Sequence, residues 1–207
     1  MLPCNEDTAG LMDISLTQIG LLIATSVLLC IVFSFIFFND WQRTSELQAQ
    51  SSQFSNLLSD IDNSFFERTS LFQFSQGDYP YTVSISSEYL RVSAKGFWKN
   101  DLIVVKKFLP CPWICGTQQN WSTGEDLQTC LNESFGHRGT QGDPISSENF
   151  TTLCQERDDA IAYYAVHPLG IILNRPVYVE KVTIYYNQTQ RQDFLLVYQR
   201  YGATPPR

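Results

Sequence analysis

An uncharged, mostly apolar run of 26 residues extends from Ile14 to Asn39 and constrains the fold more than any other feature of the sequence. As a helix rising 1.5 Å per residue, this run would be about 39 Å long, which exceeds the roughly 30 Å hydrocarbon core of a bilayer. Bulky side chains dominate residues 33–41, whereas a secretory signal is cleaved after small residues. We therefore expect an uncleaved transmembrane helix over residues 14–39, preceded by a short leader segment over residues 1–13.

The apolar run continues, without a glycine or proline stop, into polar sequence that keeps a helical period. Apolar side chains recur there at spacings of seven, four, three and four, which is typical of one helix face. They are Leu47, Phe54, Leu58, Ile61 and Phe65. We therefore predict an amphipathic helical extension over residues 40–68, so that the two segments together form one helix of about 50 residues.

Beyond residue 70, the pattern changes from helical spacing to alternation, which indicates strands. The segments that fit strands are residues 81–86, 90–95 and 101–109, followed near the C-terminus by a hairpin of residues 177–186 and 194–201. The apolar stretch of residues 160–173 is interpreted as a strand pair broken around His167-Pro168 and Gly170. The predicted fold class is therefore α+β: a long N-terminal helix followed by an antiparallel β-sheet domain over residues 70–202.

Residues 110–159 show no sustained periodicity and are interpreted as an insertion between strands. This segment holds four of the six cysteines, namely Cys111, Cys115, Cys130 and Cys154. An even number of cysteines in a loop-like segment favours two disulfides, with three connectivities open. A Cys4 zinc site would need CxxC knuckles, and a thioredoxin-type redox pair would have two residues between its cysteines where "CPWIC" has three. The insertion is therefore predicted to be a disulfide-stapled loop.

The side of the membrane is indicated by two opposing signals. The leader has no Lys or Arg and the far flank offers only Arg43, so the positive-inside rule alone slightly favours an outside N-terminus. Against this, four N-x-[ST] glycosylation sequons lie C-terminal to the apolar run, at Asn120, Asn132, Asn149 and Asn187. Together with the predicted disulfides, they lead us to expect a single-pass protein of the cell membrane with an extracellular, glycosylated C-terminal domain.

The charge balance argues against nucleic acid as a partner. The formal net charge is −7, and a nucleic-acid-binding surface would instead need clustered Lys and Arg. Most of this charge is local, because residues 111–160 contain eight acidic residues and two arginines. No calcium-binding DxDxDG spacing accompanies them, so we interpret the segment as a solvated acidic surface.

No arrangement of residues in the sequence predicts catalysis. The two histidines, His137 and His167, have no metal-ligand neighbour at i+4 and no nucleophile motif beside them. The acidic group of Glu156, Asp158 and Asp159 does not place its carboxylates on one face of either a helix or a strand. We therefore predict no enzymatic activity and no cofactor or metal.

A short leader, a membrane helix that continues as an amphipathic helix, and an antiparallel sheet with a disulfide-bonded loop together resemble the type IV pilin family and its archaeal relatives. The residues that carry the resemblance are "AGLMDISLTQIGLLIATSVLLCIVF" and the apolar stripe from Leu47 to Phe65. The resemblance implies that a prepilin peptidase removes the leader just before the apolar stretch, with Gly10 and Met12 as candidate cleavage residues. The serine of the archaeal Q-x-S-x-E motif would correspond to Ser15.

The resemblance also implies a structural role, as a pilin-like subunit or accessory component of a surface filament. The apolar helix would then leave membrane lipid and pack against copies of itself or related subunits. The alternative is a membrane-anchored extracellular binding or sensory domain that forms no filament. Three tryptophans bear on this alternative, namely Trp98, Trp113 and Trp121. If they form a surface cluster, they would suit the binding of a sugar or a protein partner. The usual role of such residues is to fill the core.

Overall fold

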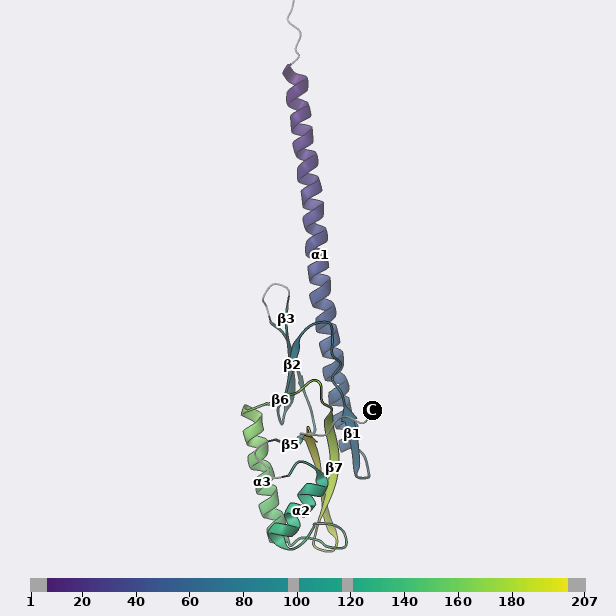
Figure 1. The fold of residues 1–207 in the computed structure, drawn as a ribbon, viewed down its shortest axis with the longest axis vertical. Coiled ribbons are helices and arrows are strands. Elements are labelled where there is room, and N and C mark those ends of the chain that lie inside the picture. The colour runs from purple at the N-terminus through teal and green to yellow at the C-terminus, as the bar shows by residue number, and fades with distance from the viewer. Residues whose placement is uncertain (1–6, 97–100, 117–120, 201–207) are drawn as a thin grey trace, which may run out of the picture. The chain divides into compact units, whose positions relative to one another are not determined.

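The computed structural model describes residues 7–96, 101–116 and 121–200, and the chain divides into two units between Arg43 and Thr44. The elements are α1 (Asp7–Asp62), β1 (Arg68–Phe72), β2 (Tyr81–Ile85), β3 (Tyr89–Lys95), β4 (Asp101–Lys107), β5 (Trp113–Cys115), α2 (Gly124–Phe135), α3 (Ser147–Val166), β6 (Leu169–Ile171), β7 (Val177–Tyr186) and β8 (Gln190–Tyr198) (Figure 1). A long apolar N-terminal helix followed by sheets confirms the α+β class.

Helix α1 is continuous over 56 residues and therefore joins the apolar and amphipathic segments, as predicted. It ends at Asp62, short of the predicted end at residue 68, and β1 already begins at Arg68. The helix is closed by Ser64, whose backbone N–H and side-chain hydroxyl both donate to the Ile61 carbonyl. The chain then turns away, which leaves Phe65 exposed rather than buried in the stripe.

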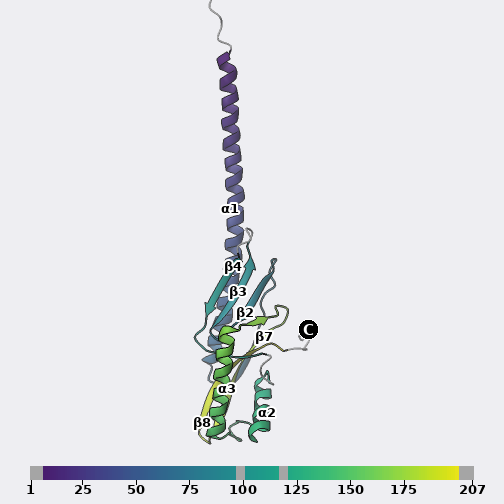
Figure 2. The same ribbon diagram turned by 90° about the vertical axis from the view of Figure 1, so that its left-hand side faces the viewer.

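The second unit contains two four-stranded sheets. Sheet A has the order β1-β7-β8-β5. Sheet B has the order β4-β3-β2-β6, and Figure 2 shows β4, β3 and β2 side by side. The predicted strands and the C-terminal hairpin are present with shifted ends, since β8 begins at Gln190 rather than at residue 194. Within the described ranges, every strand pair is antiparallel except β5 with β8. Sheet A is therefore mixed. Its strand β5 lies outside the β7–β8 hairpin and runs parallel to β8, whereas the other strand pairs of this sheet are antiparallel.

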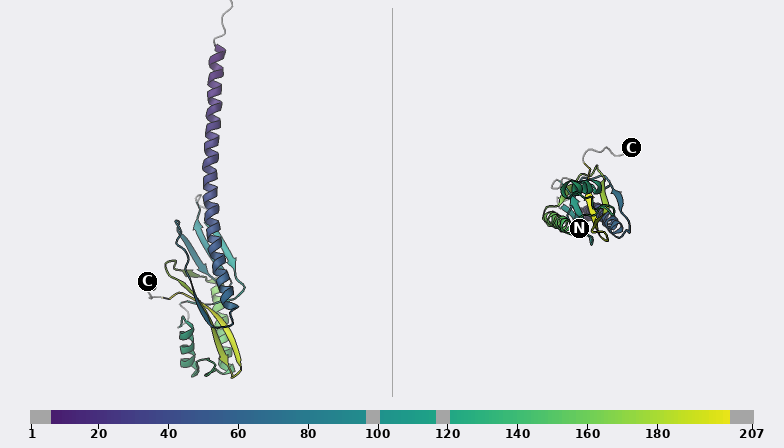
Figure 3. Two further views of the ribbon diagram at one scale, coloured as in Figure 1. Left: turned by 90° about the vertical axis from the view of Figure 1, so that its right-hand side faces the viewer. Right: turned by 90° about the horizontal axis from the view of Figure 1, so that it is seen from below.

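Alternation along β8 divides the interior into two cores. Leu195 and Val197 face the first core, which also holds the α1 stripe and the buried residues of β2 and β3. Phe194, Leu196 and Tyr198 face the second core, which α2 and α3 cover. Sheet A thus buries both faces, and its β7–β8 hairpin continues past the C-terminal end of α1 (Figure 3). Strands buried on both faces carry consecutive apolar residues, as "FLLVY" does in β8.

The predicted loop-like insertion of residues 110–159 and the strand pair of residues 160–173 are wrong. These residues form β5, α2 and α3, and α3 continues to Val166 before the short strand β6. Capping groups begin both helices: Thr123 accepts from the Asp126 N–H in a reciprocal capping box, and Ser146 accepts from the Asn149 N–H. Gly136 ends α2 in the left-handed conformation, with φ of 75°.

The buried α1 stripe predicts a sharp contrast between two phenylalanines. Phe54 is fully buried against the rings of Phe72, Phe74 and Phe108, whereas Phe65 is 88% exposed. We expect Phe54→Ala to lower the free energy of unfolding by about 3–5 kcal/mol and Phe65→Ala to change it by less than about 0.5 kcal/mol. Denaturant unfolding of the full chain in detergent, followed by tryptophan fluorescence, measures both. Equal effects would contradict this assignment of the stripe.

Candidate functional site

The first candidate site is the apolar surface of α1 in the first unit. Apart from Ile36, which is buried, its large side chains are exposed: Leu16, Ile19, Leu21, Leu22, Ile23, Val27, Leu28, Leu29, Ile31, Val32, Phe33, Phe35, Phe37 and Phe38. A contiguous exposed apolar surface of this extent marks contact with lipid or with other proteins. By length and composition, α1 is the one helix among the described residues that could cross a membrane.

One face of this apolar helix carries small residues at helical spacing. Ser26, Cys30 and Ser34 lie four residues apart and line a shallow depression, together with Val27, Ile31, Phe35 and Phe38. Small residues four apart let a second helix approach closely. Nearby, the Thr25 hydroxyl donates to the Leu21 and Leu22 carbonyls, so this polar group is satisfied inside the helix. The surface can therefore be covered equally by lipid or by another helix.

In the second unit, a buried lysine holds the end of α1 on sheet A. The Lys181 ammonium donates to the carbonyls of Asp62 and Ser64, both at 2.7 Å, and lies 3.0 Å from the Asp193 carboxylate. Its side chain is only 7% exposed. A cation at a helix C-terminus satisfies carbonyls that lack helical partners and complements the helix dipole. This cluster fixes where the helix stops and the following chain begins.

The charge state of Asp193 is set by the same cluster. Burial raises the pKa of this carboxyl, but hydrogen bonds from Lys181 and Thr183 outweigh that effect and hold the pKa below its usual value. The ionised carboxylate is therefore the form that the folded protein stabilises.

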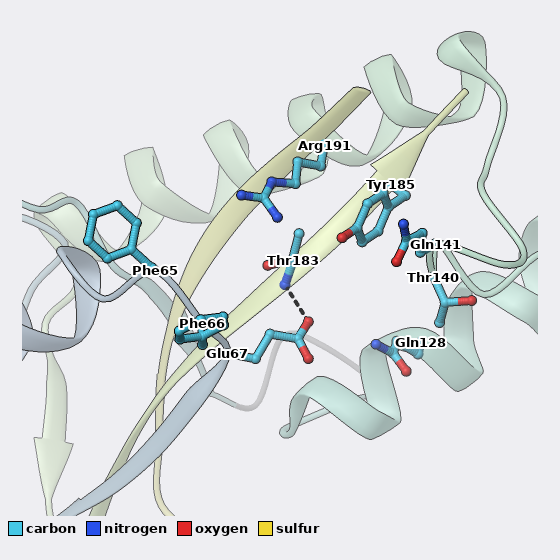
Figure 4. Close-up of a pocket in the computed structure, with 9 residues that line it drawn as sticks. All are labelled: Phe65, Phe66, Glu67, Gln128, Thr140, Gln141, Thr183, Tyr185 and Arg191. Carbon is cyan, nitrogen blue, oxygen red and sulfur yellow. Dashed lines mark hydrogen bonds between the residues drawn. The ribbon is translucent and has the colours of Figure 1, made fainter. Parts of the chain in front are cut away.

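The second candidate site is a groove of about 470 Å³ beside the α1–β1 connection (Figure 4). It is lined by Phe65, Phe66, Glu67, Gln128, Thr140, Gln141, Thr183, Tyr185 and Arg191. Two exposed phenylalanine rings and a guanidinium stand with amide and hydroxyl groups around it, while the Glu67 carboxylate accepts the Thr183 N–H at 2.9 Å. Such a lining is suited to binding, because it offers ring faces and hydrogen bonds but no nucleophile paired with a base. The helical spacing predicts that Phe65 belongs to the buried stripe, so the sequence does not indicate this groove.

The predicted disulfides are not formed in the described structure. Cys30, Cys111, Cys115, Cys130 and Cys154 are free. The last four do not share one loop: they lie in a loop, in β5, in α2 and in α3, respectively. Cys115 is buried in the second core, and this burial raises the pKa of its thiol. Cys130 and Cys154 pack against the same core. Cys4 lies outside the described residues.

The sequons and the leader residues occupy different environments. Asn120 lies outside the described residues, whereas Asn132 is exposed on α2. Asn149 is half-buried in the first turn of α3, and Asn187 is exposed in the β7–β8 turn with φ of 57°. Of the described sequons, Asn132 and Asn187 are thus the more accessible. The candidate cleavage residues Gly10 and Met12 lie within α1, which begins at Asp7.

The histidines and acidic residues singled out in the sequence are not brought together. His137 lies 2.7 Å from Asp143 on the surface, where hydrogen bonds from His137 and the Arg138 N–H lower the pKa of the Asp143 carboxyl. His167 caps α3. Among the residues described, no group of three or more His, Cys, Asp or Glu side chains could hold a metal ion.

The other acidic residues and the tryptophans have structural partners. Asp158 pairs with Arg157, and Asp159 accepts from Gln155. Trp113 and Trp121 are buried edge-to-face in the second core, with ring centroids 4.7 Å apart, so they form no surface cluster. Trp98 lies outside the described residues.

The lowered pKa of Asp193 predicts how stability depends on pH. Its ionised form stabilises the fold above the unfolded pKa near 4, and this contribution is lost as the pH falls through the lower folded pKa. Because the side chain is 38% exposed, we expect a modest effect: Asp193→Asn costs about 1–2 kcal/mol at neutral pH, and the difference from wild type shrinks toward about pH 3.

Urea unfolding across this pH range measures the effect. The matched control is Asp158→Asn, which removes a carboxylate that is 58% exposed and should change stability by less than about 0.5 kcal/mol. A constant gap between Asp193→Asn and wild type at every pH would contradict the prediction.

Comparison with known proteins gives no neighbour from which function could be transferred. No protein-family model matches the chain, and no curated protein or solved structure is similar to it. The function is therefore argued from the residues of this chain alone.

Proposed function

We propose that this protein is a membrane-anchored structural protein of the cell surface, a pilin-like subunit or accessory component of a filament. The observation that carries the proposal is the division of α1 into two chemically different parts. Its first part exposes apolar side chains all round, and its second part buries one stripe in the first core. A helix of this kind can hold a folded domain while its other part rests in lipid or in the interior of an assembly.

Assembly uses the same surface that the membrane covers. Before assembly, lipid covers the apolar part of α1; afterwards, copies of this helix or of related subunits replace the lipid. Ser26, Cys30 and Ser34 supply the face along which two helices approach. The buried stripe and Lys181 attach the domain to the second part of the helix, so the domain follows α1 into the assembly.

On this proposal, the C-terminal domain lies outside the cell and carries glycans, with Asn132 and Asn187 as the accessible acceptors among the described sequons. The cysteines then lie in an oxidising compartment, where disulfides can form.

The N-terminal residue of the mature chain tests the proposal directly. Mass spectrometry of protein from its native membrane should find a chain that begins at Leu11 or Asp13, after removal of the leader at Gly10 or Met12. An intact Met1, or the loss of Met1 alone, would contradict processing by a prepilin-type peptidase. That result would favour the alternative, a permanent anchor for an extracellular binding domain. The groove beside Phe65 and Phe66 is the observation that supports this alternative.

Self-association through α1 is the second expectation. We expect Ser26→Ile with Ser34→Ile to weaken association of the full chain in detergent about tenfold or more, because bulky groups keep the helices apart. The control is Leu28→Phe with Val32→Phe, which adds volume about 200° round the helix and should leave association within about threefold of wild type. Förster transfer between labelled chains measures both. Equal effects of the two double variants would contradict a specific contact through this face.

A further inference from the structure

Strand β4 forms one edge of sheet B and exposes apolar side chains there. Among the described residues, β4 pairs with β3 on one side and with no strand on the other. Ile103 and Val105 are 49% and 54% exposed on this strand. An edge strand with an apolar centre, as residues 102–105 form here, is a template for pairing with another strand, and proteins usually cover or interrupt such an edge.

The hydrogen bonding of β3 with β4 shows which backbone groups are available. The Phe108 N–H donates to the Glu88 carbonyl at 3.0 Å, so this opposed pair is a hydrogen-bonded pair. Hydrogen-bonded pairs alternate along an antiparallel ladder, which makes Leu102, Val104 and Lys106 the residues bonded to β3. The backbone groups of Asp101, Ile103, Val105 and Lys107 therefore point away from the sheet.

The sequence "DLIVVKK" is complementary to itself in one antiparallel register. With Val104 opposite Val104 of a second copy, Asp101 faces Lys107 and Ile103 faces Val105. All four of these residues belong to the outward-pointing set, so the charged and the apolar pairs both form hydrogen-bonded pairs. A parallel in-register arrangement would instead place Lys107 opposite Lys107. Lys107 thus opposes parallel pairing, whereas in the antiparallel register it faces Asp101 of the second copy, which is favourable.

We propose that the free edge of β4 pairs with β4 of a second copy of this chain and joins two sheets B into one continuous sheet. Opposite charges at both ends of the strand and the two Ile103–Val105 pairs between them set the register. The proposal does not depend on the proposed function, because it concerns sheet B alone and not the apolar part of α1.

This contact differs in symmetry from an association through α1. An antiparallel pair of identical strands is related by a two-fold axis perpendicular to the sheet, so every direction within the sheet is reversed in the second copy. The part of α1 that packs on sheet B is reversed as well. The contact therefore joins two second units that run in opposite directions, whereas association along α1 in one membrane joins parallel helices.

Zero-length cross-linking with a carbodiimide, which joins a carboxylate to an amine in direct contact, tests the register. Asp101 and Lys107 of one copy are about 20 Å apart along the strand, at roughly 3.3 Å per residue, so they cannot be linked within a chain. With the full chain in detergent, we expect a peptide that contains an Asp101–Lys107 link in the covalent dimer. A dimer without this link would overturn the proposal.

Charge reversal tests the energetics, measured as the dimer dissociation constant by sedimentation in the Ser26→Ile, Ser34→Ile background. Lys107→Asp places like charges at both ends of the contact and should weaken dimerisation about tenfold or more. Adding Asp101→Lys should restore it to within about threefold, because the opposite charges then meet again in exchanged positions. Wild-type-like affinity of Lys107→Asp, or no rescue by the second change, would overturn the proposal.

Two further variants distinguish the loss of this contact from a loss of folding and from a general effect of charge. Val105→Pro removes an N–H that points away from β3, so it should abolish the dimer without affecting the β3–β4 ladder. Arg68→Asp, a matched charge reversal on exposed β1, should leave the dissociation constant unchanged. A dimer that survives Val105→Pro in a folded protein would overturn the pairing of β4 edges.

Discussion

Burial of the α1 stripe is the interaction on which the rest of the second unit depends. Leu47, Phe54, Leu58 and Ile61 are fully buried, and they contact side chains from both sheets in the first core. Burial of each such side chain contributes about 1.5–3 kcal/mol relative to exposure, so four of them outweigh any single polar interaction described in this protein. Without the stripe, the inner faces of both sheets would lose their shared cover.

Polar interactions then determine where this helix ends on the sheets, whereas apolar burial supplies most of the stability of the contact. Lys181 contacts two carbonyls at the end of α1 and one carboxylate on β8, so the helix end is registered against the β7–β8 hairpin. The second core lies on the opposite face of sheet A, where α2 and α3 cover Phe194 and Leu196. Sheet A is therefore the layer that connects the two cores, and the groove beside Phe65 and the free edge of β4 are left at the periphery.

Several elements could be predicted from the sequence because their signals are local. The helical spacing from Leu47 to Ile61 and the alternation in residues 81–85 report a buried face directly, and both are confirmed. The helices α2 and α3 were not predicted, although Thr123 and Ser146 are cap residues, because the Gly, Ser, Thr and Asn content of the same segment is typical of loops. The predicted disulfides failed for a related reason: an even count of cysteines carries no information about the elements on which they lie.

The sequence by itself determined that a long apolar helix continues into an amphipathic one and that strands follow, because these properties depend on the order of neighbouring residues. Only the tertiary structure decided which side chain ends the stripe, that Trp113 and Trp121 are core residues, and that Lys181 meets the end of α1. It also decided that β4 lies at an edge, which turns a self-complementary segment into an available surface. These outcomes depend on contacts between residues up to 119 positions apart, and no local pattern encodes which distant surface a residue will meet.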